Sequence, residues 1–382
     1  MKKVHSIADL RVLARRRVPR IFFDYVDGGA NSERTMRANE ADYGRWHLRQ
    51  HVLRDVSAVD LSTSFLGGRH ALPIMLGPLG FAGMLSRRGE AAAARAAGAA
   101  GIAACVSAFA ICSFEEVAKA ASGPVYSQLY VLRDRKTTEA MIARAEAAGA
   151  AALFLTVDTC VTPVRERDAR NGFRNMTRPT LPQWIDMLRR PAWCLGVIAD
   201  GMPQVGGAGS LGYGRGVMEQ AGNLARQIDA SLNWADVDWL RRRWPGKLVL
   251  KGILEPEDAT RAVAAGADAI VVSNHGGRQL DGASSTIMAL PAVVEAVAGR
   301  IDVLVDGGIR HGSHIAIALA LGAAGISIGR PYAWGLAAGG EAGVATAISL
   351  LGAELSATLA LMGIASVDAL KAAGRAAVEG PD

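Results

Sequence analysis

The chain has 382 residues, of which 50% are hydrophobic and 20% charged, and this composition is typical of a globular protein with a large core. Lysine and arginine number 42 against 36 for aspartate and glutamate, giving a formal net charge of +6, which favours an anionic ligand or an anionic membrane surface. No run of five basic residues occurs, and we therefore expect no nucleic-acid partner.

The N-terminal segment predicts a short amphipathic helix. Ser6 is a good N-cap residue, and Ile7, Leu10 and Leu13 share one side of the helix that follows. No apolar stretch follows the lysines at the start, so we expect no secretory signal. Nowhere do 18 apolar residues follow one another, and we expect no segment that spans a bilayer.

Eight short apolar runs repeat from residue 72 onwards, and Ala-rich helical patterns lie between most of them. Continuous runs of β-forming residues that alternate with helices indicate parallel strands buried on both faces. The runs are LPIMLGP (72–78), GIAACVS (101–107), GPVYSQLY (123–130), AALFLTVD (151–158), KLVLKGI (247–253), AIVVSNHGG (269–277), IDVLVDGGI (301–309) and GISIGRP (325–331).

Eight strands that each lead into a helix predict an α/β protein with a single (β/α)8 TIM barrel. An open, doubly wound sheet is the competing architecture, but its Gly-rich first turn and switch point are not visible near GPLGFAG (77–83). Barrels of this kind take up a chain of this length as one domain. We therefore expect one domain over residues 1–382, with an N-terminal helical segment and the barrel over roughly residues 72–365.

A long interval after the fourth strand interrupts this alternation. We interpret roughly residues 172–225 as an insert, and we expect it to be functional or partly helical because long unstructured connections are uncommon in compact domains. Its first half mixes arginines with large apolar residues: Leu181, Trp184, Ile185, Leu188, Trp193 and Leu195. This mixture suits a membrane interface, and it suits equally a cap over the active site or a subunit contact.

The four cysteines predict neither disulfides nor a metal site. Cys105, Cys112, Cys160 and Cys194 form no CxxC pair and have no histidine at zinc-finger spacing. We interpret them as reduced thiols of a cytosolic protein.

Polar side chains end six successive strands, although the strand interiors are apolar. Active sites of these barrels lie at the carboxyl ends of the strands, so the pattern predicts a site there. The residues concerned are Gln128 and Tyr130, Thr156 and Asp158, Lys251, Asn274, His275 and Arg278, Asp306 and Arg310, and Arg330.

The loops after the last two strands predict a phosphate site. Glycines let backbone N–H groups approach an anion, and these two loops are the usual phosphate position of the fold. Gly307, Gly308 and Gly329 supply the glycines, with Arg310 and Arg330 as charge partners. Simple tight turns are the alternative.

His275 and Arg278 place a titratable base beside a fixed cation in a glycine-rich loop. Asp158 ends a neighbouring apolar strand, and holding an imidazole in one tautomer would give its buried carboxylate a partner. Lys251 lies in VLKGI (249–253). Two roles are open for it: an ion pair across the barrel mouth, or stabilisation of negative charge on a bound cofactor.

The motif SNHGGRQLD (273–281) resembles the active-site signature of the FMN-dependent α-hydroxy-acid dehydrogenases and oxidases. The resemblance runs in order along nearly the whole chain: PRIFFDYVDGGA (19–30), LPIMLGPLG (72–80), QLYVLRD (128–134), LTVDT (155–159), RERDARNGF (165–173), VLKGI (249–253), DGGIRHG (306–312) and IGRP (328–331). It implies an enzyme that oxidises an (S)-2-hydroxy acid to the 2-oxo acid with FMN.

The resemblance also implies a division of roles. His275 would take a proton from the substrate, and Asp158 would orient it. The substrate carboxylate would be bound by two arginines and a tyrosine: Arg165, Arg278 and Tyr25. Tyr130 would form a hydrogen bond to the substrate hydroxyl or the developing carbonyl. Whether a hydride or a C2 proton leaves the substrate is open.

The FMN contacts follow by the same resemblance. The flavin ring would meet Pro78, Leu79, Gly80, Ser107, Gln128, Thr156 and Ser273. Lys251 would lie near the ring and stabilise its reduced, anionic form. Asp306 would bind the ribityl chain, and the phosphate would be held by Gly307, Gly308, Arg310, Gly329 and Arg330.

Departures from the family pattern bear on the substrate. Phe109 stands where plant glycolate oxidases carry tryptophan, and Gly80 stands where many oxidases have alanine. The insert resembles that of (S)-mandelate dehydrogenases, whose equivalent segment mediates membrane association, and it shares features with membrane-linked L-lactate dehydrogenases. We expect oxidation of (S)-mandelate to benzoylformate, with electrons passed to a membrane quinone.

The same branch of the family implies a homotetramer held at the cytoplasmic face of the membrane by residues 172–225. Oxidation of L-lactate, or an oxidase that produces peroxide from oxygen, is the alternative within the family. Two alternatives come from other classes of protein: a non-redox phosphate-binding barrel, and a barrel that serves only as a membrane-bound scaffold. The first would lack the base and the arginine pair, and the second would carry no flavin.

Overall fold

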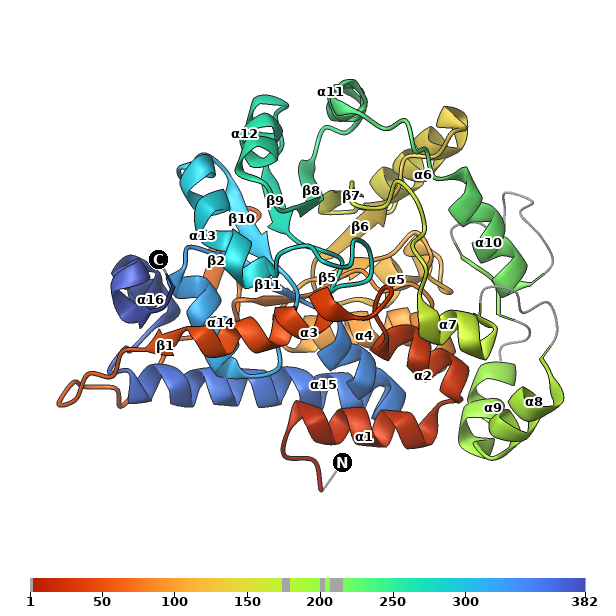
Figure 1. Cartoon of the computed structure of the whole chain (residues 1–382), viewed down its shortest axis with the longest axis horizontal. Coiled ribbons are helices and arrows are strands. Elements are labelled where there is room, and N and C mark those ends of the chain that lie inside the picture. The colour runs from red at the N-terminus through yellow and green to blue at the C-terminus, as the bar shows by residue number, and fades with distance from the viewer. Residues whose placement is uncertain (1–2, 174–178, 200–202, 207–215, 382) are drawn as a thin grey trace.

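Eight parallel strands form a closed barrel in a computed structural model of the whole chain, which describes residues 3–173, 179–199, 203–206 and 216–381. The barrel order is β10-β11-β4-β5-β6-β7-β8-β9, so neighbours in the sequence are neighbours in space (Figure 1). The strands are β4 (Ile74–Leu76), β5 (Ala104–Val106), β6 (Val125–Leu129), β7 (Ala152–Thr156), β8 (Lys247–Ile253), β9 (Ala269–Val272), β10 (Asp302–Val305) and β11 (Gly325–Ile328). Each predicted run contains one of them, and the predicted (β/α)8 barrel is confirmed.

Helices surround the barrel and begin where their capping residues place them. Ser113 and Glu116 form a capping box on α5, and Asn233 and Asp236 form one on α11. The outer helices are α4 (Gly89–Ala99), α5 (Phe114–Ala120), α6 (Arg135–Ala147), α11 (Trp234–Arg243), α12 (Pro256–Ala264), α13 (Thr286–Val297), α14 (Gly312–Ala320) and α15 (Arg330–Leu361).

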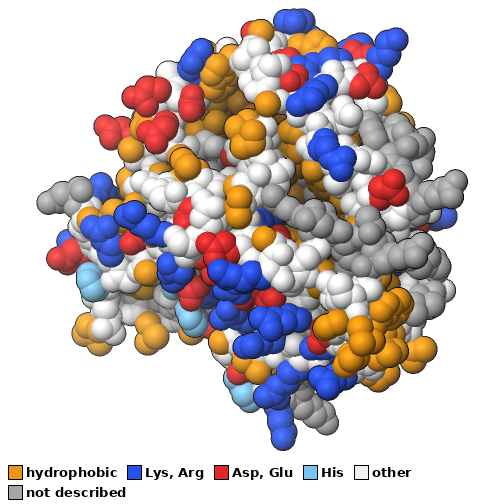
Figure 2. Space-filling view, turned by 45° about the vertical axis from the view of Figure 1, so that its right-hand side comes forward, with side chains coloured by type: hydrophobic (Ala, Val, Ile, Leu, Met, Phe, Trp, Pro, Cys, Tyr) orange, Lys and Arg blue, Asp and Glu red, His pale blue; other side chains and the backbone are white. Residues whose placement is uncertain are grey.

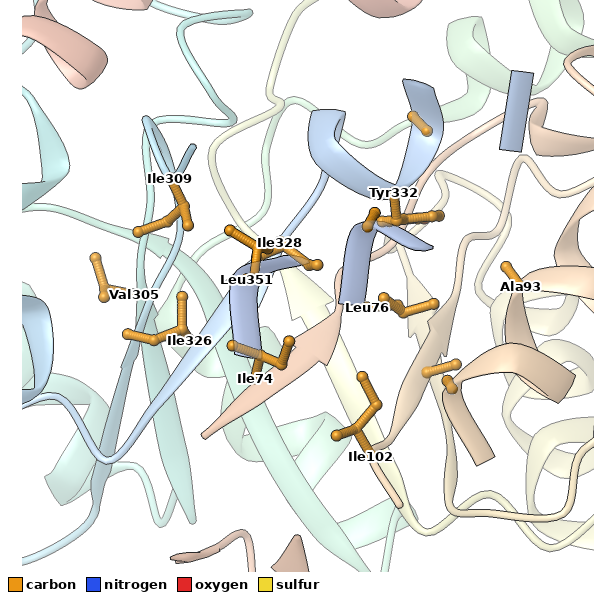
Figure 3. Close-up of a cluster of buried hydrophobic side chains, with 14 of the residues drawn as sticks. Ile74, Leu76, Ala93, Ile102, Val305, Ile309, Ile326, Ile328, Tyr332 and Leu351 are labelled. Atoms are coloured by element: carbon orange, nitrogen blue, oxygen red, sulfur yellow. The ribbon is translucent and has the colours of Figure 1, made fainter. Parts of the chain in front are cut away.

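The strands are apolar throughout because both of their faces are buried. Tyr126 and Phe154 stack inside the barrel with ring centroids 5.5 Å apart, and Ile74, Leu76 and Ile328 pack outward toward the helices (Figure 3). The hairpin of β2 (Thr63–Phe65) and β3 (Gly68–His70) joins the interior cluster near the strand starts. These layers leave only the carboxyl ends of the strands open for side chains with chemical roles.

The N-terminal segment is helical, as predicted. Ser6 Oγ accepts the N–H of Asp9 at the start of α1 (Ile7–Arg17). Ile7 and Leu10 are buried against the core, whereas Leu13 is only partly buried. The chain continues through α2 (Arg20–Asp27), α3 (Arg34–Ala41), η1 (Asp42–Arg45) and β1 (His47–Leu48), which pairs with β12 (Val378–Glu379) beyond α16 (Val367–Ala373).

The described parts of the insert are largely helical. They comprise α8 (Leu181–Leu188), α9 (Pro191–Ile198) and α10 (Val217–Gln227), which follow α7 (Glu166–Asn171) at one side of the barrel (Figure 1). Trp193 faces inward, since its ring stacks on Phe22 at 5.3 Å and its Nε1 donates to the Met84 carbonyl at 2.7 Å. The insert is therefore docked onto α2 through this tryptophan.

Helix α15 is long and apolar enough, by length and composition alone, to cross a membrane. Gly339 and Gly340 have non-helical backbone angles and divide it into two parts. It packs against α1, α4 and α14, in the place of the last barrel helix. Packing within the barrel therefore explains the buried face of α15.

We predict that Gly343→Ala destabilises the protein. A Cβ atom at Gly343 would collide with the carbonyl of Gly335, because the two parts of α15 touch there through their backbones. Overpacking of this kind costs about 1–3 kcal/mol in the free energy of unfolding. Denaturant titration would measure the loss, with Gly44→Ala as the control because nothing lies within 4 Å of a Cβ at that exposed position. Equal stability of the two variants would contradict the prediction.

Candidate active site

The loop after β9 carries His275 in a strained turn. His275, Gly276 and Gly277 have φ values of 59°, 66° and 74°, and a non-glycine residue in this region costs about 1–3 kcal/mol. Ser273 Oγ accepts the His275 N–H at 3.1 Å, and Asn274 Oδ1 accepts the Gly277 N–H at 3.0 Å. These two side chains hold the turn, which projects the imidazole over the barrel mouth.

Asp158, two residues beyond β7, fixes the imidazole. His275 Nδ1 lies 2.8 Å from Asp158 Oδ1, and the two side chains are 23% and 10% exposed. Burial lowers the pKa of His275, and Asp158 offsets this only in part. Burial would raise the pKa of Asp158, but His275 and Lys251 outweigh it and lower that pKa. The pair is therefore a neutral imidazole and an ionised carboxylate, with the proton on Nδ1 and the lone pair on Nε2.

A bulge in β8 makes room for this pair. The register of β8 against β9 shifts between Lys251 and Ile253, and Gly252 between them has a φ of 115°. A Cβ atom there would lie 2.7 Å from the Cβ of Asp158. Only glycine permits this approach, so the bulge sets the position of Asp158.

Lys251 takes part in an ion pair across the barrel mouth. Its Nζ lies 3.1 Å from Asp306 Oδ2 and donates to Ser273 Oγ at 2.9 Å. Burial would lower the pKa of Lys251, but Asp306 and Asp158 outweigh burial and raise it. The ammonium is therefore charged. Of the two roles that the sequence left open for Lys251, the ion pair is present in the structure. Stabilisation of negative charge on a cofactor stays a prediction.

The residues predicted to bind a carboxylate lie together beside His275. The Arg278 guanidinium lies 4.8 Å over the Tyr25 ring and donates to the Gly28 carbonyl at 2.9 Å. Arg165, at the start of α7, donates through Nε to the Arg278 carbonyl at 3.4 Å. Burial, followed by the charges of Asp158 and the nearby Tyr25, raises the pKa of Tyr130. The four side chains thus share one side of the mouth.

Aromatic rings wall this side of the site. Tyr25 stacks on Phe173 at 4.5 Å and meets the edge of Phe81 at 5.3 Å, and Phe109 meets Tyr130 at 5.7 Å. Neither Phe81 nor Phe173 was among the residues predicted to form the site. Phe81 directly follows the predicted LPIMLGPLG motif, and Phe173 ends RERDARNGF, so their places in family motifs are the signals that could have identified them.

The residues predicted to meet a flavin ring lie at the ends of several strands of the same mouth. Pro78, Leu79 and Gly80 follow β4 and are half-buried, whereas the polar members are buried: Ser107, Gln128, Thr156 and Ser273. A Cβ atom at Gly80 would lie 3.1 Å from Phe109 Cβ and Tyr25 Oη. Gly80 therefore lies where the ring-binding and carboxylate-binding parts of the site meet.

Three buried polar atoms at this mouth have no hydrogen-bond partner within the part of the chain that the structure describes. They are Gln128 Nε2, Asp158 Oδ2 and Asp306 Oδ1. An unsatisfied buried donor or acceptor costs about 1–3 kcal/mol. Their clustering at the ends of β6, β7 and β10 indicates that a polar ligand completes the site.

Arg330 and Arg310 lie at the predicted phosphate position and also bind the protein. Arg330 donates through its three nitrogens to the carbonyls of Val26, Gly276 and Gly28, which leaves two of its five N–H groups. Burial lowers the pKa of Arg330 to about 9, and Arg278 and Arg310 add to this effect. Three cations near one another favour binding of an anion.

Of the two glycine-rich loops, the one at Gly329 is open, and the one at Gly307 and Gly308 packs against Asn39 of α3. Gly307 and Gly308 have φ values of 92° and 76°, and no atom lies within 4 Å of a Cβ built at Gly329, at the start of α15. Arg310 lies 4.8 Å over the Trp334 ring and 3.2 Å from Glu40. Backbone N–H groups of a helix N-terminus beside arginines form a suitable phosphate cradle.

Gln279 is a further residue of the site that the sequence analysis did not name. Its Oε1 accepts from Arg165 at 3.3 Å, and its Nε2 donates to the Asp158 carbonyl at 3.0 Å. It therefore links the base pair to the carboxylate-binding arginines. Its place inside SNHGGRQLD is the signal that could have identified it.

Comparison with known proteins identifies relatives over nearly the full length. Residues 14–376 match the family model described as FMN-dependent dehydrogenase. An L-lactate dehydrogenase of Caulobacter vibrioides (strain NA1000 / CB15N) is 48% identical over 368 residues, with 95% of each chain covered.

Solved structures give the same fold with a different named substrate. The crystal structure of the monotopic membrane protein (S)-mandelate dehydrogenase superposes with a TM-score of 0.94 at 37% identity, covering 99% of this chain and 100% of that one. A structure of mandelate oxidase with (S)-2-phenylpropionate has a TM-score of 0.81 at 37% identity, with 97% of each chain covered.

The residues at the mouth fit FMN. The unpaired amide of Gln128 and the buried hydroxyls beside it suit the polar edge of a flavin ring, and the unpaired oxygen of Asp306 suits a polyol chain. The open loop at Gly329, with Arg310 and Arg330 beside it, suits a phosphate.

We predict that Gly252→Ala lowers turnover. The added methyl group would displace Asp158 from His275, and a displacement of about 1 Å from the reacting geometry can cost about 10²-fold in rate. Steady-state kinetics would measure the loss. Gly149→Ala is the matched control, because it has a similarly positive φ of 76° but no atom within 4 Å of its Cβ. It should lose stability and keep its turnover, and equal kinetics of the two variants would contradict the prediction.

Proposed function

Because the chain belongs to the FMN-dependent dehydrogenase family, it is an enzyme that oxidises a 2-hydroxy acid with FMN, and we propose that His275 is its base and (S)-mandelate its substrate. The assignment of His275 as the base rests on one observation: His275 and Asp158 form a buried pair, 2.8 Å apart, beside two arginines.

His275 is suited to accept a proton. Its Nδ1–H is donated to the ionised Asp158, so Nε2 carries the lone pair. A low pKa keeps the imidazole neutral at physiological pH, and only the neutral form can act as a base. The proton would be held at Nε2 after transfer, where Asp158 stabilises the resulting imidazolium.

Arg165 and Arg278 are suited to bind the substrate carboxylate. Arg278 is held by the Gly28 carbonyl and the Tyr25 ring, so its position is set before substrate binds. A planar guanidinium binds a carboxylate through two parallel hydrogen bonds. Tyr130, buried behind Phe109, would donate its hydroxyl to the substrate oxygen.

FMN, when bound, supplies the acceptor for the electron pair that leaves C2 of the substrate. Lys251 contributes a buried positive charge near Asp306 and Ser273. That charge would stabilise a reduced, anionic ring. Asp306, Gly307, Gly308, Arg310, Gly329 and Arg330 would hold the ribityl chain and the phosphate.

Mandelate is the first candidate because the carboxylate-binding residues lie against aromatic rings. Phe81, Phe109 and Phe173 offer a phenyl group the edge and face contacts that aromatic pairs prefer. L-lactate is the second candidate, because the relative at 48% identity is named for it. The substrate methyl group of lactate would leave most of that wall without contact.

The insert is the proposed membrane contact. Five apolar side chains on α8 and α9 are exposed: Leu181 (73%), Trp184 (51%), Ile185 (43%), Leu188 (69%) and Leu195 (74%). Figure 2 shows hydrophobic side chains gathered at the lower right, where these helices lie, with basic side chains beside them. An apolar face bordered by cations suits an anionic membrane surface. A membrane quinone would then be the electron acceptor on the cytoplasmic side.

A homotetramer, expected from the family resemblance, is the proposed assembly. Sedimentation equilibrium of the detergent-solubilised protein would test it, since a tetramer has four times the mass of the chain.

The decisive experiment is anaerobic reduction of the bound flavin. We expect (S)-mandelate to bleach the flavin absorbance faster than L-lactate or glycolate, with slow recovery when air is admitted. His275→Ala should keep its flavin and lose the bleaching by orders of magnitude, because the base acts in the chemical step. Fast recovery with peroxide would move the protein to the oxidase alternative, and bleaching by His275→Ala would remove the base from its role.

The rate should fall on the acidic side of neutrality. Neutral imidazole is the active form, so kcat/KM is lost as the pH falls through the His275 pKa, which lies below its ordinary value of 6.5. Asp158 raises that pKa, so Asp158→Asn should move the acidic limb to still lower pH and reduce the plateau by about 10²-fold or more. A pH–rate profile of both proteins checks the sign. An acidic limb at higher pH in the variant would contradict the assignment.

Removing apolar groups from the insert should release the protein from membranes. Replacing Leu181, Leu188 and Leu195 by serine removes three exposed leucines, each of which gains about 1.5–3 kcal/mol on full burial. Partition onto anionic vesicles should fall at least about tenfold, measured by co-sedimentation. Leu361→Ser is the control, because that leucine is 67% exposed but ends α15. Unchanged partition of the triple variant would rule out the insert as the anchor.

A further inference from the structure

Helix α3 touches two loops of the site at once. It lies outside the barrel on the face seen in Figure 1. One of its neighbours is the loop after β9, where Thr35 N–H donates to Asp281 and Gly282 N–H donates to Thr35 Oγ1. The other is the loop after β10, where Glu40 pairs with Arg310. The helix therefore lies between the catalytic loop and the phosphate loop.

Asn39 is the buried residue of α3 that reaches the catalytic loop. Its Nδ2 donates to Asn274 Oδ1 at 2.7 Å, and Asn274 Nδ2 donates to Asn39 Oδ1 at 2.8 Å. The two residues are 1% and 3% exposed and are separated by 235 positions in the chain. A buried, reciprocal amide pair fixes both side chains, because loss of either leaves the other with unsatisfied groups.

Asn274 in turn sets the geometry of the strained turn. Its Oδ1 accepts from Gly277 N–H at 3.0 Å as well as from Asn39, and its Nδ2 donates to the Ser284 carbonyl at 2.9 Å as well as to Asn39. Both lone pairs and both N–H groups are thus in use. Within the described residues, Asn39 is the partner of this amide that comes from outside the loop.

The phosphate loop packs against Asn39 without a direct hydrogen bond to its amide among the described contacts. A Cβ atom at Gly308 would collide with the Asn39 carbonyl, and Tyr43 Oη donates to the Gly307 carbonyl at 3.4 Å. The Asn39 side chain lies beside Gly307, where a Cβ atom would be 3.3 Å from Asn39 Cγ and Nδ2. Its printed hydrogen bonds go instead to Asn274 and to Thr286, whose N–H it accepts at 3.2 Å and whose hydroxyl donates to the Asp306 carbonyl. Replacing the side chain therefore acts first on the catalytic turn.

We propose that Asn39 is a positioning residue that holds His275 in place through Asn274. The inference rests on the proposed role of His275 as the base. Without the Asn39 amide, Asn274 loses two of its four hydrogen bonds, and the turn at residues 274–277 loses the anchor that keeps it in its strained conformation. The imidazole then departs from Asp158, although neither residue has been changed.

The first experiment compares Asn39→Ala with two variants of the same helix. Arg37→Ala removes an exposed side chain, and Thr35→Val removes the hydroxyl that accepts from Gly282 without touching Asn274. At saturating FMN, Asn39→Ala should lose about tenfold or more in kcat, with KM and the FMN dissociation constant each within about threefold. Thr35→Val should lower the melting temperature and keep the kcat.

The pH profile separates positioning from general loss of stability. His275 faces Asp158 after β7, Lys251 of β8 and Arg165 before α7. Of these, Asp158 alone raises its pKa. An imidazole that moves away from Asp158 has a lower pKa, so the acidic limb of Asn39→Ala should shift to lower pH. The limb of Thr35→Val should coincide with that of the unchanged protein.

Two further measurements do not depend on turnover or on one variant. Hydrogen exchange of the segment 273–278 should accelerate in Asn39→Ala and not in Arg37→Ala. In a double-mutant cycle, Asn39→Ala should add little to the effect of Asn274→Ala, because the first residue acts through the second. If Asn39→Ala does not fold, Asn39→Leu serves instead, since it fills a similar volume without a charge and removes both the donor and the acceptor; a shift of the limb in the same direction is expected.

Three results would overturn the proposal: an unshifted acidic limb with normal kcat, additive effects in the double-mutant cycle, or weakened FMN binding with normal kcat once FMN is saturating. Failure of the proposed function has a different signature. It would appear as retained activity in His275→Ala, whereas an inactive His275→Ala beside a normal Asn39→Ala would reject only the role of Asn39.

Discussion

The hydrogen bond between His275 and Asp158 is the interaction on which the rest of the site depends. It requires a histidine in a left-handed backbone conformation after β9 and an aspartate that a glycine bulge in β8 leaves room for. Neither feature is favourable by itself. The surrounding hydrogen bonds of Ser273, Asn274 and Gln279 compensate for the strain, so the catalytic geometry is a property of several strands together.

The charge distribution explains why the site is built for anions. Arg278 and Arg310 lie near enough to Arg330 to lower its pKa. Most of the hydrogen bonds that these arginines donate go to backbone carbonyls rather than to carboxylates. Lys251 is neutralised by Asp306, so the arginines carry the surplus. A phosphate at one end of the mouth and a substrate carboxylate at the other would balance it, which ties cofactor binding and substrate binding to a single electrostatic field.

The sequence was sufficient for the barrel and for the residues at its strand ends. Apolar runs of strand length identify strands buried on both faces, and the polar residue after each run then falls at the mouth without further information. Asn39 and Phe173 could not be assigned in this way, because their roles depend on partners brought together by the fold. The inward orientation of Trp193 likewise could not be predicted from the sequence, since the ring on which it stacks, Phe22, lies far away along the chain. Pairings of this kind leave no periodic signal in a single chain.

The aromatic rings that begin at Trp193 have a consequence for the architecture of the enzyme. Trp193 stacks on Phe22, Phe22 meets Phe173, and Phe173 stacks on Tyr25. The insert and the substrate pocket are therefore parts of one packed unit, in which the pocket wall is the inner end of the element that carries the exposed apolar face. Trimming the proposed membrane contact would preserve the proposed pocket only if Phe173 and the ring behind it were spared, so the two proposed functions share one set of packed rings.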